Sequence, residues 1–128
     1  MLDMQFEDVS AEELENEIFI ETLDHFAKMK EDLGMESQWS MFDGGPMSAD
    51  AMLLQDKQYK VTYTYIEQMG DTMEDVTWAE VSMFAPSGSI KDLWFAANSC
   101  IKQSGTHHSY IEGFDVNEDG TLSLVTGS

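Results

Sequence analysis

Arginine is absent from the 128-residue sequence, and six lysines face 25 aspartates and glutamates, so the formal net charge is −19. Binding to nucleic acid or to an anionic membrane surface relies on Lys and Arg, so this balance argues against both. The usual bidentate clamp for a phosphate or carboxylate ligand is missing as well. The charge instead favours solubility and rapid association with a basic partner.

Cysteine occurs once, at Cys100, so no disulfide can form within the chain, in agreement with a reducing compartment. No apolar run approaches the roughly 18 residues that a membrane-spanning helix needs. The acidic start of the sequence also lacks the layout of a signal peptide. Fourteen aromatic residues are spread along the chain and can supply a core. We therefore expect one soluble, cytoplasmic domain that covers residues 1–128.

Two segments have the pattern of helices. Residues 10–34 combine a capping box, Ser10 with Glu13, an apolar stripe near period 3.6 and a glycine at the C-cap position. A second capping box opens a helix over about residues 90–103, with Trp94 at the margin of its buried face.

Strand patterns complete the fold prediction. They occupy residues 39–42 as a short candidate, then 59–66, 75–85, 109–116 and 121–126. The apolar phase shifts within 75–85, which indicates a β-bulge near Ala79 and Glu80. The order α-(β)-β-β-α-β-β predicts an α+β fold, with an antiparallel sheet of four to five strands packed against two helices.

One loop matches part of a metal-binding motif. Asp115, Asn117 and Asp119 followed by Gly120 resemble the front of a calcium-binding EF-hand loop. The twelfth position, which needs a bidentate glutamate, is Thr126, and a tight hairpin turn explains the same residues. The turn is the favoured interpretation, so we expect no bound metal and no cofactor.

Catalytic signatures are missing. Cys100 falls on the predicted buried face of the second helix, where a lone cysteine acts as a small hydrophobe. His107 and His108 are adjacent, so a strand would point them to opposite faces. His25 lacks any metal-ligand spacing, and Glu80 is the only carboxylate with a plausible apolar setting for acid–base work. We predict that the protein is not an enzyme.

Methionines and aromatic residues gather in the stretch that is least committed to regular structure. Such a segment either forms an adaptable binding surface or fills gaps in the core, and both interpretations stay open. The carboxylates of the first helix offer a second contact surface for a basic partner. The candidate partner-binding residues are Met35, Trp39, Met41, Phe42, Glu12, Glu13 and Glu17.

The element order, the Ala97-Asn98 pair in the second helix and the acidic Asp119-Gly120 turn resemble the type III secretion chaperone-like fold. Small acidic secretion chaperones and the YbjN-like proteins share that fold. The resemblance covers most of the chain and rests on topology, size and acidity. It implies a non-enzymatic dimer that holds an extended partner segment against hydrophobic patches on its sheet and helices.

We therefore expect a protein-binding module, chaperone-like or regulatory, whose partner is basic or extended. The alternative is a nucleic-acid mimic of phage or mobile-element type, in which rows of carboxylates occupy the basic groove of a DNA-binding protein. Twelve of the 25 acidic residues lie within residues 1–36, which is less even than a mimic requires. The acidity also suits a saline habitat and then has no bearing on mechanism.

Overall fold

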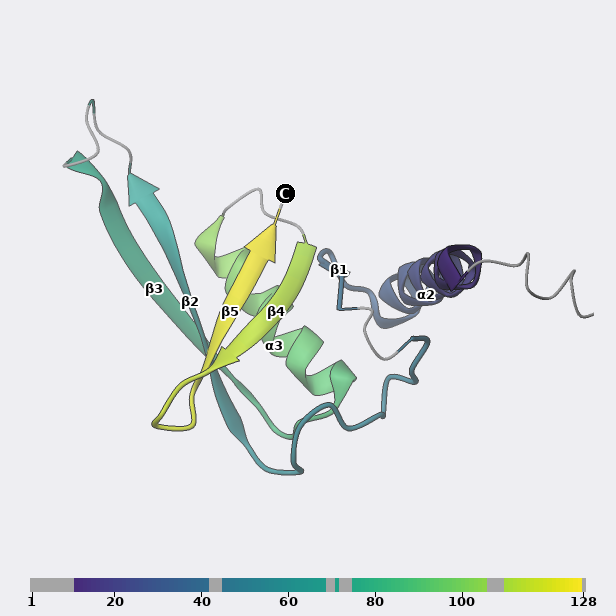
Figure 1. The fold of residues 1–128 in the computed structure, drawn as a ribbon. Coiled ribbons are helices and arrows are strands. Elements are labelled where there is room, and N and C mark those ends of the chain that lie inside the picture. Colours follow the sequence, from purple (N-terminus) through teal and green to yellow (C-terminus); the bar gives the residue numbers. More distant parts are fainter. Residues whose placement is uncertain (1–10, 42–44, 69–70, 72–74, 106–109, 128) are drawn as a thin grey trace, which may run out of the picture.

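The computed structural model describes residues 11–41, 45–68, 71, 75–105 and 110–127. Within these residues it contains two helices and a five-stranded sheet (Figure 1), so the predicted α+β class and element order are confirmed. The elements are α2 (Ala11–Leu33), β1 (Gln38–Trp39), β2 (Tyr59–Gln68), β3 (Thr77–Ala85), α3 (Ile90–Ser104), β4 (Tyr110–Val116) and β5 (Leu122–Gly127). Neither helix is both long and apolar enough to cross a membrane over the residues described.

The sheet is mixed, with the strand order β1-β4-β5-β2-β3. Its two hairpins, β2–β3 and β4–β5, are antiparallel as predicted, but β2 and β5 join them in parallel, and β1 also pairs in parallel with β4. The prediction of an antiparallel sheet is therefore wrong at these two junctions. At the β2–β5 junction the reason is that α3 connects β3 to β4 as a crossover, and a helical crossover lets two strands of one sheet run in the same direction.

The ends of α3 follow the predicted capping chemistry. The Ser89 hydroxyl accepts a hydrogen bond from the Asp92 backbone N–H at 3.2 Å, and Gly105 closes the helix with a φ of 68°. The helix packs on β2 and β3. We call the sheet face toward α3 the inner face and the opposite one the outer face. Val61, Tyr63 and Leu122 are buried on the inner face.

Four aromatic rings connect the helices to the sheet. Trp94 of α3 is fully buried, not marginal as the sequence predicts, because its ring lies 5.6 Å from Trp39 and 6.4 Å from Phe26. Its indole N–H donates to the Ser37 carbonyl at 3.1 Å. Phe114 of β4 completes the cluster, 6.0 Å from Trp39. Phe26 thereby holds α2 beside β1, while the first half of α2 extends away from the sheet (Figure 1).

The predicted bulge near Ala79 and Glu80 is wrong. The β2–β3 register is continuous from Tyr59 opposite Ala85 to Ile66 opposite Trp78, and the irregularity follows Ile66. The apparent phase shift arises because Trp78 belongs to the outer face, where its side chain is 61% exposed. Alternation along β3 is therefore regular, and its outer face is more apolar than expected.

Because Trp94 joins α2, β1 and α3, the change Trp94→Ala should lower the free energy of unfolding by about 3–5 kcal/mol. Phe95→Ala is the matched control, since the next residue of the same helix is 59% exposed and should cost less than about 1 kcal/mol. Urea denaturation followed by circular dichroism measures both values. Equal losses for the two variants would contradict the central place of Trp94 in the core.

Candidate functional site in the fork between β2 and β5

The two hairpins meet over only two residue pairs. Val61 pairs with Leu122 and Thr62 with Ser123, and the described residues show no ladder pair between β2 and β5 beyond these. Both strands continue past this point, β2 to Gln68 and β5 to Gly127, and their ribbons diverge (Figure 1). We call the space between residues 63–67 of β2 and 124–126 of β5 the fork.

Aromatic side chains from β2 form the inner side of the fork. Tyr63 and Tyr65 stack with their ring centroids 5.9 Å apart. The Tyr63 hydroxyl lies 3.1 Å from the Thr126 hydroxyl, and this hydrogen bond spans the space between the two strands. The C-terminal end of α3, at Ser104 and Gly105, borders the same space. The fork is therefore backed by the helix and open toward the outer face.

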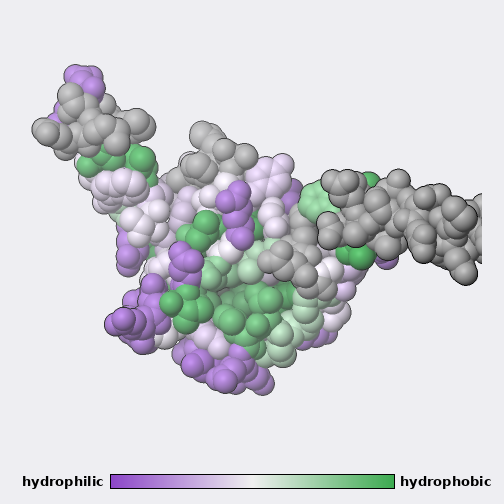
Figure 2. Space-filling view, viewed as in Figure 1, coloured by the Kyte–Doolittle hydropathy of each residue, from purple (hydrophilic) through white to green (hydrophobic). Residues whose placement is uncertain are grey.

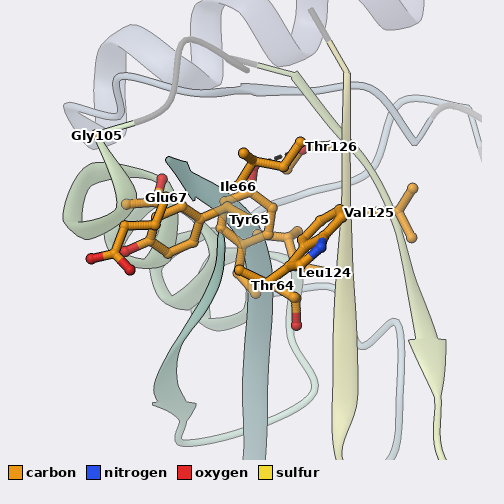
Figure 3. A pocket seen from close by; sticks show the side chains of 11 residues that line it. Thr64, Tyr65, Ile66, Glu67, Gly105, Leu124, Val125 and Thr126 are labelled. Atoms are coloured by element: carbon orange, nitrogen blue, oxygen red, sulfur yellow. Dashed lines mark hydrogen bonds between the residues drawn. The ribbon is translucent and has the colours of Figure 1, made fainter. Parts of the chain in front are cut away.

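A cavity of about 830 Å³ occupies the fork (Figure 3). Its apolar lining includes Ile66, Trp78 and Val125, which are respectively 41%, 61% and 37% exposed. Threonine, tyrosine and serine hydroxyls are part of the remaining lining, and among the described residues Glu67 is the only charged one in it. Figure 2 shows apolar side chains near the tip of the β2–β3 hairpin and at the centre of the same face, with hydrophilic ones around them.

Backbone groups add hydrogen-bonding capacity to this cavity. In a strand, successive N–H and C=O groups alternate between its two edges. The edge of β2 that faces away from β3 and the edge of β5 that faces away from β4 both border the fork. Unpaired strand edges are templates for an additional strand. The fork thus combines two strand edges with apolar side chains that a bound segment can contact.

The predicted partner-binding residues do not line this cavity. Met35 and Trp39 are 7% and 1% exposed and belong to the core, which corrects their assignment to a binding surface. Trp39 is drawn inside because it packs between Phe26 and Trp94. Met41 is half-buried against the same core, and Phe42 lies outside the described residues. For this segment, gap filling in the core is the interpretation that the structure favours.

The acidic candidates lie on α2, apart from the fork. Glu17 is exposed, and Glu12 and Glu13 belong to the first turns of that helix. Exposed apolar side chains share the same stretch of helix, among them Ile18 and Ile20 at 52% and 57%. The surface of α2 is therefore mixed and is not a uniform row of carboxylates.

The loop that resembles a calcium site is a hairpin turn. The Asn117 N–H donates to the Thr121 carbonyl at 2.9 Å, and Gly120 has a φ of 87°. The Asp119 carboxylate accepts from the Thr121 N–H and hydroxyl, and these bonds lower the pKa of Asp119. Asp115 lies beside them, paired with Ser123 in the ladder. Among the described residues no three His, Cys, Asp or Glu side chains are grouped to hold a metal ion.

The remaining chemical candidates do not meet at one place. Glu80 is exposed on the outer face opposite Thr64, so its carboxylate is not in the apolar setting that acid–base work needs. The His25 ring bonds the Met47 carbonyl. His107 and His108 lie outside the described residues. Cys100 is fully buried under the sheet, as its pattern predicts.

Comparison with known proteins provides no relative for the chain. No family model matches it, and the searches of curated proteins and of solved structures find no match either. The function is therefore inferred from the geometry of the fork and the charge of the chain. Sequence reasoning missed the fork, and the one available signal was the run of alternating tyrosines in β2.

Burial raises the pKa of the Cys100 thiol from 9.0 to about 11. A hydrogen bond between the thiol and the backbone lowers the pKa, but by less than burial raises it. The neutral thiol is thus favoured in the folded state, and the resulting stability is lost as the pH rises from about 9 toward 11. At pH 8 we expect a thiol-reactive disulfide reagent to modify native Cys100 at least a hundredfold more slowly than the urea-unfolded chain. Equal rates in both states would show that the thiol is accessible.

Proposed function

We propose that this protein is a non-enzymatic binding module that holds an extended segment of a partner protein in the β2–β5 fork. The observation that carries the proposal is the divergence of β2 and β5 after two residue pairs, around a cavity lined by both apolar and hydroxyl-bearing side chains. An extended segment is the ligand whose chemistry fits strand edges, because its own backbone presents donors and acceptors at the same spacing.

The side chains around the fork determine which residue types fit in a bound segment. Main-chain hydrogen bonds to a strand edge contribute affinity, while pockets for alternate side chains contribute specificity. Ile66, Trp78 and Val125 present apolar contacts toward the outer face, and Tyr63 and Tyr65 do so toward the inner face. A segment with apolar residues at alternate positions meets these contacts. Serine or threonine at other positions can bond the lining hydroxyls.

The net charge of the chain favours association with positively charged partner proteins. A net charge of −19 attracts a basic protein over long distances and raises its association rate, an effect that salt weakens. Inside the cavity, however, Glu67 is the only charged lining residue in the part of the chain that the structure describes. We therefore infer an apolar extended segment flanked by lysine or arginine, with the flanks steering association and the segment filling the fork.

This role agrees with what the resemblance to the type III secretion chaperone-like fold implies, namely capture of an extended partner segment on a small acidic protein. A chaperone-like or regulatory task follows from the same binding event. The nucleic-acid mimic finds less support, because exposed Ile18, Ile20 and Leu23 interrupt the carboxylates of α2. A phosphate mimic would present polar side chains along this surface.

A random ten-residue peptide library displayed on phage tests the proposal. We expect the enriched peptides to alternate apolar residues and to carry basic flanks. Synthetic copies should shift the fluorescence of Trp78 to shorter wavelength, since Trp39 and Trp94 are already buried.

The change Val125→Glu places a charge among the apolar contacts of the fork and should weaken peptide binding roughly tenfold or more.

Val116→Glu is the matched control. It introduces the same charge at an exposed valine on the partner strand of the same hairpin, outside the cavity lining, and should leave affinity within about twofold. Fluorescence titration of the labelled peptides measures both affinities. Peptides that bind wild type and Val125→Glu equally well, or a library that yields no enrichment, would overturn the fork as the binding site.

A further inference from the structure

The second strand edge of interest is the outer edge of β3. The sheet order β1-β4-β5-β2-β3 makes β3 terminal, and it runs for nine residues, whereas the opposite terminal strand β1 has two. Natural edge strands carry lysine, proline or bulges that prevent pairing with another chain. β3 contains no lysine and no proline, and its register with β2 is continuous along its length from Trp78 to Ala85.

The sequence of β3 is complementary to itself in one register. An antiparallel pair of two copies related by a two-fold axis at Val81 overlaps all nine residues, because Val81 is the middle residue of Thr77–Ala85. In that register Trp78 of one copy lies opposite Phe84 of the other. Glu80, the only charged residue of the strand, lies opposite Ser82 and thus avoids its own counterpart. An axis at Glu80 would instead oppose two carboxylates, which is destabilising.

The outer face supplies apolar contacts for this register. Trp78 and Phe84 are 61% and 59% exposed, and both point to the face away from α3. Aromatic residues placed opposite each other on adjacent strands stabilise strand pairing. Ile66 already lies opposite Trp78 on β2. Phe84 of a second copy would extend this row of apolar side chains across the junction.

The distribution of charge favours a second copy at this edge. Two chains of −19 repel each other at most surfaces, and 12 of the 25 acidic residues lie within residues 1–36. Helix α2, which includes most of that stretch, is on the opposite side of the molecule from β3 (Figure 1). Pairing through β3 therefore keeps the two most acidic regions far apart.

We propose that the protein forms a two-fold homodimer by antiparallel β3–β3 pairing centred on Val81, which joins the two five-stranded sheets into one of ten strands. The inference rests on the outer edge of β3 and not on the proposed function, although Trp78 of β3 also lines the fork. Each dimer then carries two forks.

Sedimentation velocity over a concentration series, at two salt concentrations, tests the dimer. We expect a reversible wild-type dimer that salt strengthens. Ser82→Glu places a carboxylate opposite Glu80 of the other copy, and the two-fold axis repeats this contact once. The change should therefore raise the dimer dissociation constant roughly tenfold. Ser82→Gln, of similar size without charge, should stay within about threefold of wild type. Ser82 is exposed, so neither change should alter the circular dichroism spectrum.

A pair of double variants separates register from net charge. Glu80→Lys with Ser82→Glu restores opposite charges across the axis and should dimerise at least as well as wild type. Glu80→Lys with Ser82→Lys opposes lysines and should dissociate, although its net charge is smaller than that of wild type. A wild-type chain that is monomeric at its highest soluble concentration would overturn the proposal. So would a dimer whose dissociation constant is the same in all four variants.

Discussion

The contact between Trp39 and Trp94 organises the structure, because it joins a two-residue strand to the only helix that lies on the sheet in the described part of the chain. Their ring centroids are 5.6 Å apart, and neither ring is exposed by more than 1%. Beside them, the Asn98 side-chain oxygen accepts from the Ser37 N–H and hydroxyl at 2.8 and 2.7 Å and from the Glu36 N–H at 3.1 Å. These bonds hold the segment after α2 against α3 and so place β1 on β4.

This anchoring leaves the two sides of the sheet unequal. The β4–β5 hairpin is held by β1 and by Phe114 in the aromatic cluster, so one of its edges is covered. The β2–β3 hairpin is held from the inner face by α3 and from the side by only two residue pairs with β5. Among the described residues, both of its edges consequently have backbone groups without a neighbouring strand, one edge toward the fork and one at β3. The proposed binding site and the proposed dimer contact thus lie at opposite edges of the same hairpin.

Local chemistry made the helices and turns predictable. The Ser89 cap, the helix-ending Gly105 and the turn at Asn117–Gly120 all depend on residues within a few positions of one another, and each has the expected geometry. The errors came where burial depends on distant partners. Trp94 and Met35 are buried because α2, β1 and α3 pack around them. The spacing of apolar residues in the sequence does not show which elements pack together. Trp78 is outside because of the strand register.

The sequence by itself determined an acidic α+β chain with a capped second helix and alternating strands, since these follow from composition and from contacts between near neighbours. Only the tertiary structure decided that β5 lies beside β2, that the two strands part after Thr62 and Ser123, and that β3 is the terminal strand of the described sheet. The reason is that every strand can hydrogen-bond at either edge, so sequence pattern does not specify its neighbours. The path of α3 across the inner face and the burial of Trp94 make that choice.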